Sequence, residues 1–459
     1  MLDSDDHSID YQRLWSVCSN CVDGKRFPSI PMEEKMMQLV ELDKTQIVDV
    51  NETNNQRDLV SLRAVAQKRT QGSFVMQDSV DQANASFRSL LLNDYRSYAS
   101  IRLAFDGRPV AFFGANGAGK TNLLEALSLF APGRGLRGAR LQELPRAMGA
   151  GGWAASAMLS RETDDLVKLG VGAAAHKPDK RLCRIDEKTA KGPSAFSDYV
   201  RFLWLTPAQD GLFVAAAGER RKFLDRMTQA RDAAHARAAS EYETAMRQRQ
   251  KLLDDGVSDD AWLRALETKM AEAGVAVAAA RLETRALLSD ADTTKLSDGA
   301  FPAADIRLEG KLEDALGEKP AADVEDDYIN VLRNNRRIDR EAGRATMGPH
   351  RSDMIVSHRP KQMPARLCST GEQKALLIGL VLANACILAD SGARAPLVLL
   401  LDEIAAHLDT ERRAALFDII ESTRFQCFMT GTDISLFSAW GARAQAFRVG
   451  DGKITETTL

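Results

Sequence analysis

A glycine-rich loop and a distant pair of carboxylates constrain the fold of this chain more than any other feature. The loop follows the apolar residues 110–113 and reads Gly114, Ala115, Asn116, Gly117, Ala118, Gly119, Lys120, Thr121. Asp402 and Glu403 directly follow a second apolar run, residues 397–401. More than half of the 459-residue chain lies between the two segments. The fold must therefore bring two buried strands together around a large insertion.

Both segments contain the residue types that hold a nucleotide. Glycines let backbone N–H groups approach phosphate oxygens, and the start of the following helix adds a positive dipole. Lys120 is expected to reach the β- and γ-phosphates, and the Thr121 hydroxyl is expected to ligate Mg²⁺. At a strand end, Asp402 can complete the metal site while Glu403 orients and deprotonates a water molecule. ATP and Mg²⁺ are the predicted cofactors, and residues 114–121 are the predicted phosphate-binding loop.

A third segment, residues 368–374, permits two interpretations. Ser369 and Glu372 have the spacing of a capping box, which simply starts a helix. The Ser369 hydroxyl, the Gly371 amide and the helix N-terminus can also form an anion site. Both interpretations can hold at once, because a capped helix N-terminus is also what binds a phosphate.

Residues 220–289, between the loop and the carboxylates, have a helical pattern. Apolar residues recur at alternating three- and four-residue steps, which predicts the seam of two packed helices. The seam residues are Leu263, Leu266, Met270, Ala273, Val277 and Ala280. Residues 254–256 predict the turn between two antiparallel helices. The seam spans only about three heptads, so the pattern predicts a short arm and not a long rod.

The rest of the pattern from residue 87 onward is α/β. Residues 90–92 and 95–105 predict a strand hairpin, and residues 397–401 predict a buried strand. Further predicted elements are helices at residues 121–130, 369–385 and 411–421, a strand at 425–430 and a hairpin at 444–455.

The composition is that of a soluble globular protein, with 44% hydrophobic and 27% charged residues. The acidic residues 1–6 precede no apolar signal segment, so we expect a cytoplasmic protein. Cys18 and Cys21 have metal-knuckle spacing, but without a second close pair the six cysteines are expected to be reduced thiols.

The net charge of −3 conceals local arginine clusters that can attract a polyanion. One predicted loop holds Arg134, Arg137, Arg140 and Arg146, and another holds Arg333, Arg336, Arg337, Arg340 and Arg344.

Together, the three motifs resemble the ATPase heads of the ABC and SMC class, and within it the RecF family of bacterial recombination mediators. The resemblance covers residues 86–459, and its more particular marks are residues 114–122, 204–207, 219–225 and 348–353. It implies an α/β fold, an ABC-type P-loop ATPase head with an inserted, mainly helical arm. The expected parts are a disordered N-terminal extension (1–85), the first part of the head (86–215), the arm (216–340) and the second part of the head (341–459).

The resemblance also implies a homodimer that closes on two ATP molecules. Ser369 and Gly371 of one copy would touch the γ-phosphate held by the other, and Asp409 would act at the same interface. Gln209 would sense the metal and the attacking water. Hydrolysis would be slow and would serve as a timer.

The position that is a His switch in transporter-type ATPases falls on Thr432 or Asp433 here. The implied substrate is DNA, single-stranded or at a junction with duplex, and the implied partners are the RecR and RecO mediators. The candidate DNA contacts are Arg134, Arg137, Arg140, Arg336 and Arg337.

The expected function is therefore ATP-dependent DNA binding in recombinational repair and replication restart, in support of recombinase loading and the SOS response. His350 and Arg351, on the turn at residues 348–353, are expected to be functional. The basic run at residues 220–222 is expected to lie on a helix surface or to pair at a domain interface, and not to contact DNA. Two alternatives are the ATPase subunit of a membrane transporter and an SMC-like chromosome structural ATPase; the missing His argues against the first and the short arm against the second.

Overall fold

The computed structural model describes residues 85–161, 165–257, 259–291, 300–391, 395–423, 425–450 and 452–459. The expected disordered extension lies outside these residues except for its last position, as does the Cys18–Cys21 pair. Asp451, in the turn predicted between the last two strands, also lies outside them.

A six-stranded sheet holds both nucleotide motifs. Its order is β15-β14-β3-β13-β12-β8. The strands are β3 Val110–Phe113, β8 Arg201–Leu205, β12 Leu397–Leu401, β13 Gln426–Gly431, β14 Gln445–Gly450 and β15 Lys453–Thr457. All neighbours pair in parallel except β14 and β15. Every residue of β3, β12 and β13 is buried, as expected for parallel strands covered on both faces. The strand before the glycine loop and the strand before the carboxylates are thus separated by β13 alone.

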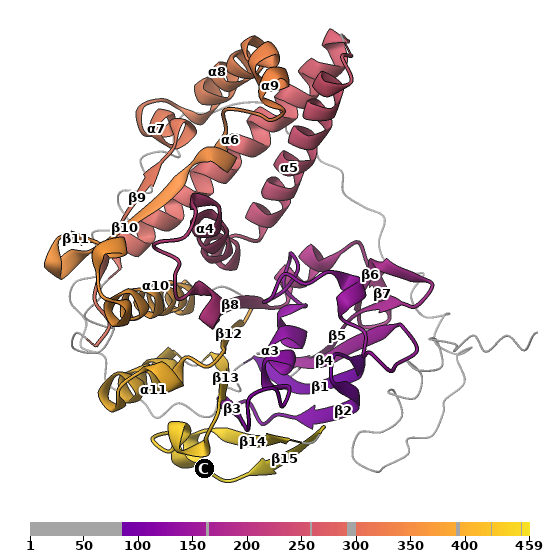
Figure 1. Ribbon diagram of the computed structural model, residues 1–459, viewed down its shortest axis with the longest axis vertical. Coiled ribbons are helices and arrows are strands. Elements are labelled where there is room, and N and C mark those ends of the chain that lie inside the picture. The colour runs from indigo at the N-terminus through magenta and orange to yellow at the C-terminus, as the bar shows by residue number, and fades with distance from the viewer. Residues whose placement is uncertain are drawn as a thin grey trace, which may run out of the picture. The chain divides into compact units, whose positions relative to one another are not determined.

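A second six-stranded sheet, which is antiparallel, covers one face of the first. Its order is β2-β1-β4-β5-β6-β7. The strands are β1 Ser86–Tyr95, β2 Tyr98–Ala104, β4 Trp153–Ser160, β5 Leu166–Ala174, β6 Lys177–Ile185 and β7 Lys188–Ala190. Helix α3, Lys120–Ser128, lies between the sheets, because its leucines share a buried core with Leu90 of β1 and Leu400 of β12 (Figure 1). The predicted hairpin is β1 and β2, whereas strands β4 to β7 were not anticipated.

Helices α10, Thr370–Asp390, and α11, Thr410–Thr423, cover the opposite face of the first sheet. Leu399 and Leu401 of β12 share one buried core with Leu377 of α10 and Phe417 of α11. In the described part of the chain, α10 is the one helix long and apolar enough to cross a membrane, and most of it is buried in this core.

The insertion is a helical arm (Figure 1). Its helices are α4 Ala217–Arg231, α5 Ala233–Asp254, α6 Asp260–Asp290, α7 Lys311–Glu318, α8 Ala321–Asn334 and α9 Arg336–Ala342. Helices α5 and α6 form the predicted antiparallel pair, and all six seam residues are buried. One strand was missed here: β9 Ala304–Glu309 pairs with β10 Asp353–His358, which also pairs with β11 Met363–Pro364. A sheet therefore joins the expected arm to the expected second part of the head.

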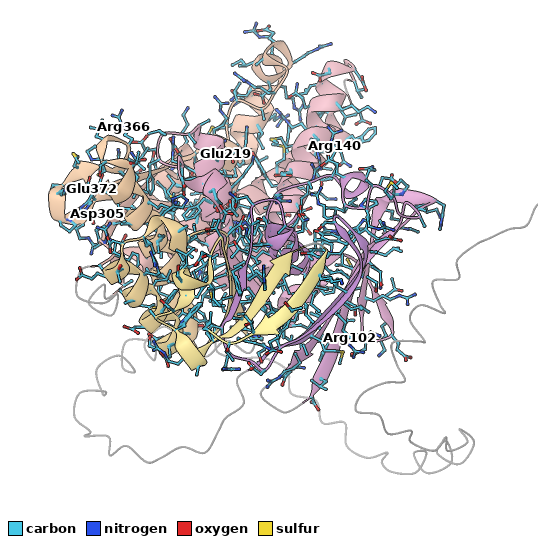
Figure 2. The ribbon with its side chains drawn as sticks, turned by 60° about the horizontal axis from the view of Figure 1, so that its bottom comes forward. Arg102, Arg140, Glu219, Asp305, Arg366 and Glu372 are labelled. Carbon is cyan, nitrogen blue, oxygen red and sulfur yellow. The ribbon has the colours of Figure 1, made fainter. Side chains whose placement is uncertain are left out.

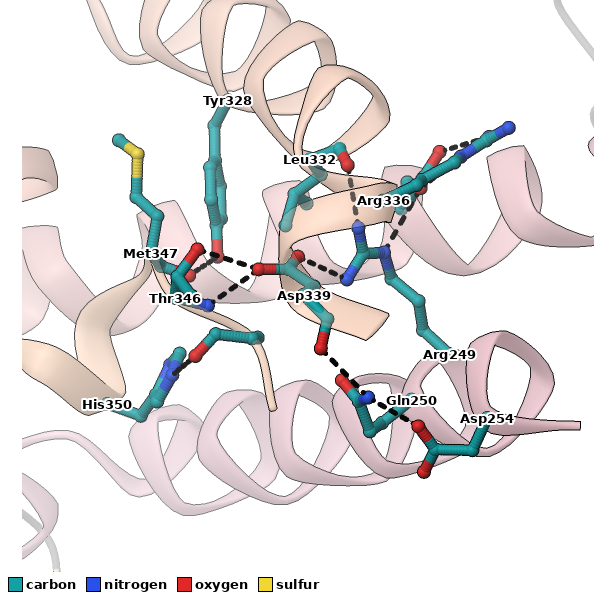
Figure 3. Close-up of polar contacts among 12 residues, drawn as sticks. Arg249, Gln250, Asp254, Tyr328, Leu332, Arg336, Asp339, Thr346, Met347 and His350 are labelled. Carbon is teal, nitrogen blue, oxygen red and sulfur yellow. Dashed lines mark hydrogen bonds and ion pairs between the residues drawn. The ribbon is translucent and has the colours of Figure 1, made fainter. Parts of the chain in front are cut away.

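Arg249 of α5 lies at the centre of a buried ion network in the arm (Figure 3). Its guanidinium contacts Glu267 at 3.0 Å and Asp339 at 2.7 Å, and donates to the carbonyl oxygen of Leu332 at 2.6 Å. Arg336 contacts the other carboxylate oxygen of Glu267 at 2.6 Å. Arg249, Glu267 and Asp339 are almost completely buried. The network therefore ties α5, α6, α8 and α9 into one body.

Arg249→Met is expected to destabilise the arm by about 3–5 kcal/mol, because it leaves buried carboxylates without their shared cation. Chemical denaturation followed by circular dichroism measures the effect as a lower transition midpoint. Arg237→Met is the control, since Arg237 is exposed on the same helix and forms only a surface pair with Glu241. A midpoint as high for Arg249→Met as for the control would contradict the prediction.

Candidate nucleotide-binding site

The loop at residues 114–121 joins β3 to α3 and requires glycine at two positions. Gly114 has a φ of 151°, and a Cβ there would lie 2.1 Å from the carbonyl oxygen of Val449. Gly119 has a φ of 106°, and a Cβ there would lie 2.7 Å from the Tyr98 hydroxyl. Both conformations are accessible mainly to glycine. The strand, loop and helix follow one another as the motif predicts.

Lys120 reaches back across the loop. Its ammonium group donates to the carbonyl oxygens of Gly114 at 2.8 Å and Ala115 at 3.0 Å, and lies 4.0 Å from the Glu403 carboxylate. Burial lowers the pKa of Lys120, while the nearby Glu403 and Asp402 carboxylates oppose that shift. The ammonium group therefore lies between the loop and the carboxylates, where a bound phosphate would meet it.

Asp402 lies beside Thr121, although 281 positions separate them in the sequence. Asp402 Oδ1 accepts hydrogen bonds from Thr121 Oγ1 at 2.8 Å and from Thr430 Oγ1 at 2.7 Å. A hydroxyl next to a buried carboxylate is a donor set that suits Mg²⁺, which binds oxygen ligands and keeps several waters. These residues fit the predicted metal, and Thr121 and Asp402 are the ones that would hold it.

Glu403 has an unusual backbone conformation. Its φ is 57°, and its N–H donates to Thr430 Oγ1 at 2.9 Å. A non-glycine residue in such a sparsely populated conformation costs about 1–3 kcal/mol and persists where the surrounding structure holds it, often at active sites. The Glu403 side chain is 32% exposed, so its carboxylate can meet a water molecule.

A cleft of about 680 Å³ opens beside Thr121 and Asp402. Gln209 lines the same cleft, and its Oε1 accepts a hydrogen bond from the Thr206 amide at 3.0 Å. The cleft brings Gln209 together with the expected metal-binding residues. Part of its wall is helix α4, through Glu219, Lys222, Phe223 and Arg226.

Ser369 begins α10 through a capping box. Ser369 Oγ accepts from the Glu372 amide at 3.4 Å, and the Glu372 carboxylate accepts from the Ser369 amide at 2.9 Å. Lys361 contacts that carboxylate and is the main cause that lowers the pKa of Glu372 to about 2. The helix-capping interpretation is confirmed. Ser369 and Gly371 are exposed, so they remain open to a phosphate held by another molecule.

Asp409 occupies a similar position at the start of α11. It is exposed, and its Oδ1 accepts a hydrogen bond from the Arg412 amide at 2.8 Å. Asp409 thus caps the helix that follows the carboxylate strand. Its expected role at an interface stays a prediction.

Three predicted DNA-binding arginines lie in the loop between α3 and β4. Arg134, Arg137 and Arg140 are exposed there, and Arg140 is visible on the surface in Figure 2. Arg137 is partly engaged, since it donates to Asn122 Oδ1 at 2.9 Å and lies 3.6 Å from Glu125. Arg134 and Arg140 are therefore the more available of the three for a phosphate.

The second arginine group does not form the expected loop. Arg336 and Arg337 are on helix α9, and Arg336 donates at 2.6 Å to both Asp260 and Glu267. Its guanidinium is held within the ion network of the arm, which leaves it less available for a phosphate, and its role as a DNA contact stays a prediction. Arg337 is exposed and forms only a surface pair with Glu341.

The turn at residues 348–353 packs the arm onto the rest of the fold. His350 Nδ1 lies 2.7 Å from the Tyr242 hydroxyl, and its Nε2 lies 2.9 Å from the Ala345 carbonyl oxygen. Burial is the main cause that lowers the pKa of His350. These contacts hold His350 against helix α5, and its expected functional role stays a prediction. In the basic run at residues 220–222, Arg220 pairs across elements and is bidentate to Asp353 at 2.7 Å, whereas Lys222 is exposed and pairs with Glu219 of the same helix.

The switch position stays a prediction. Thr432 and Asp433 follow β13 at exposed positions, and Asp433 accepts from the Ser435 amide at 2.8 Å. Sequence reasoning missed Thr430, which contacts both Asp402 and Glu403. A hydroxyl directly after the apolar residues 427–429 of a predicted buried strand was the signal that could have found it.

Comparisons with known proteins identify relatives along most of the chain. The profile of the RecF/RecN/SMC N-terminal domain family matches residues 86–454. The DNA replication and repair protein RecF of Rhizobium johnstonii is 49% identical over 372 residues, which cover 81% of this chain and 99% of that protein. The protein of the same name from Brucella abortus is 49% identical over 370 residues, which cover 81% of this chain and 96% of that protein.

A solved structure is also similar. The structure of the recombination mediator protein RecF-ATP in the RecFOR pathway matches with a TM-score of 0.70 and 20% sequence identity. The match covers 83% of this chain and 100% of that chain. At this identity the likeness supports the fold.

Proposed function

The chain belongs to the RecF family within the RecF/RecN/SMC class, and from that premise we propose that it is an ATP-dependent DNA-binding protein of replication and recombinational repair. The observation that carries the proposal is the 2.8 Å hydrogen bond between Thr121, at the start of α3, and Asp402, directly after β12. This contact supports a phosphate and metal site in a chain whose relatives are replication and repair proteins.

ATP binding and hydrolysis follow from the family and have a clear assignment of roles. The N–H groups of residues 114–121 and the Lys120 ammonium bind the phosphates. Thr121 and Asp402 would hold Mg²⁺, which would neutralise phosphate charge. Glu403 accepts the proton of the attacking water, and Gln209 orients that water from the cleft.

Hydrolysis is proposed to require two copies of the chain. Ser369, Gly371 and Asp409 are exposed and are not among the described residues that line the chain's own cleft. Each copy would present them to the nucleotide held by the other. ATP thereby closes a homodimer, and turnover is slow because the site must assemble before water is activated.

DNA is the proposed substrate of the closed dimer, either single-stranded and gapped DNA or a junction with duplex. Binding would stimulate the weak ATPase activity, and release of DNA would follow hydrolysis. RecO and RecR are the proposed protein partners, in support of recombinase loading and the SOS response. A cytoplasmic location is proposed, since the chromosome is there in bacteria.

Replacing both Arg134 and Arg140 with Gln is expected to weaken DNA binding and flatten its salt dependence. Each lost phosphate contact should reduce the slope of log affinity against log salt by about 1 unit, because fewer counterions are released. Fluorescence anisotropy at several salt concentrations measures both quantities. Arg237→Gln is the control, because Arg237 is another exposed arginine and lies on the arm. An unchanged slope for the double variant would remove this loop from the DNA interface.

The whole proposal is tested by measuring DNA affinity and particle mass with ATP, ADP or no nucleotide. We expect a dimer with tight DNA binding only with ATP and Mg²⁺. A monomer under all three conditions, with DNA affinity independent of nucleotide, would reject the function proposed here.

Neither alternative function is favoured by the described part of the chain. Its longest helix, α6, has 31 residues, which is far short of the rod of an SMC protein. The apolar helix α10 belongs to the core of the head.

A further inference from the structure

Strand β13 lies between β3, which precedes the glycine loop, and β12, which precedes the carboxylates. It places the hydroxyl of Thr430 next to Asp402. In β13, Met429 is paired in register with Leu401 of β12, and Thr430 is paired with Phe112 of β3. Thr430 therefore stands one position beyond the last residue of β12, beside Asp402. It is 0% exposed, so no solvent competes for its hydroxyl.

The Thr430 hydroxyl both donates and accepts a hydrogen bond. A threonine hydroxyl has one proton to donate and lone pairs that accept. Thr430 Oγ1 donates to Asp402 Oδ1 at 2.7 Å and accepts from the Glu403 N–H at 2.9 Å. One atom thus fixes the carboxylate of one residue and the backbone of the next.

These two contacts orient the two acidic residues that the proposed reaction needs, Asp402 and Glu403. Asp402 Oδ1 is held from both sides, by Thr430 and by Thr121 at 2.8 Å, which orients the carboxylate that would ligate the metal. Glu403 has a φ of 57°, and in this conformation its backbone N–H donates a hydrogen bond to the Thr430 hydroxyl. Hydrogen bonds behind a metal ligand typically determine how well the ligand works.

We propose that Thr430 is a positioning residue for ATP hydrolysis, which holds the metal-binding carboxylate of Asp402 and the base Glu403 in their relative orientation. The inference rests on the proposed function, because it assigns Thr430 to that reaction. Thr430 does not touch the nucleotide; it acts through its two neighbours.

The test compares Thr430→Val, which keeps the shape and removes the hydroxyl, with Thr430→Ser, which keeps the hydroxyl. For the Val variant we expect kcat to fall roughly 10–100-fold and the Mg²⁺ concentration for half-maximal rate to rise. KM for ATP should change less than about 3-fold, since the phosphate-binding loop is intact. The Ser variant should stay within about 3-fold of the unchanged protein in all three quantities.

A second measurement uses the full chain without metal or nucleotide. Hydrogen–deuterium exchange of the peptide spanning residues 402–405 should be faster in Thr430→Val, because the Glu403 amide has lost its acceptor, and unchanged in Thr430→Ser. ATP binding in EDTA should be equal in all three proteins, which shows that the variants are folded.

The possible outcomes distinguish a failure of the proposed role of Thr430 from a failure of the proposed function. Unchanged kcat, Mg²⁺ dependence and exchange in Thr430→Val would overturn the role of Thr430 while the unchanged protein still hydrolyses ATP. Equal losses in the Val and Ser variants would also overturn it, since the hydroxyl would then not matter. If the unchanged protein neither binds nor hydrolyses ATP, the proposed function itself fails.

Discussion

Lys120→Met is expected to lower ATP affinity roughly 100-fold and to abolish the ATP-dependent dimer. The ammonium group provides charge-assisted hydrogen bonds to the phosphates, and each is worth about 1.5–3 kcal/mol. Methionine has a similar length but offers no charge and no donor. The prediction can be checked by titrating a fluorescent ATP analogue and by measuring particle mass at saturating nucleotide.

A matched control separates this effect from a general loss of positive charge. Lys319→Met makes the same chemical change at an exposed residue that pairs only with Asp327 at the surface. Its ATP affinity and dimer formation should equal those of the unchanged protein. A Lys120→Met protein that still forms the ATP dimer would show that closure by ATP does not depend on the Lys120 ammonium group.

Glu403→Gln is expected to have the opposite effect on the dimer. The amide cannot take a proton from water, so hydrolysis should fall roughly 10²–10⁴-fold. Glutamine has the same size and leaves the backbone contact with Thr430 in place. ATP binding therefore persists, and the closed dimer should accumulate on DNA. Single-turnover hydrolysis and the lifetime of the DNA complex measure the two effects.

The control for this variant is Glu421→Gln, on α11, where the carboxylate is exposed and pairs with Arg443. It should hydrolyse ATP and release DNA at the rates of the unchanged protein. If Glu403→Gln remained monomeric with ATP and Mg²⁺, closure by ATP would be refuted. If it hydrolysed ATP normally, another residue would be the base.

The nucleotide site could be predicted because its residues encode local geometry. Positive φ angles explain the glycines of the loop, and a run of five apolar residues ending in two carboxylates indicates a buried strand with a polar end. Thr121 and Asp402 were expected to lie close together because both were predicted to bind the same Mg²⁺. The order of the strands between them could not be predicted from the residues.

Two strands and one set of ion pairs could not be predicted from the sequence, each for a physical reason. Strand β4 alternates in burial, but its alternating side chains are mostly Ala and Ser, which differ too little in polarity to reveal the period. Strand β9 depends on a partner about 50 positions away, and non-local pairing leaves no local signal. The ion pairs of Arg336 could not be predicted, because a charged helix residue looks the same in the sequence whether it faces solvent or carboxylates 69 and 76 positions earlier.

Helix α4, which forms part of the wall of the nucleotide cleft, is also tied to the long helix of the arm. Asp225 of α4 forms a bidentate pair with Arg281 of α6, at 2.7 and 2.9 Å. Burial alone would raise the pKa of Asp225, but Arg281 and His235 outweigh it and lower that pKa to about 2. The pair therefore stays ionised at every physiological pH. Through this ion pair, helix α4 of the cleft wall and the long helix α6 are held together, so a movement of either helix that keeps the pair intact must carry the other helix with it.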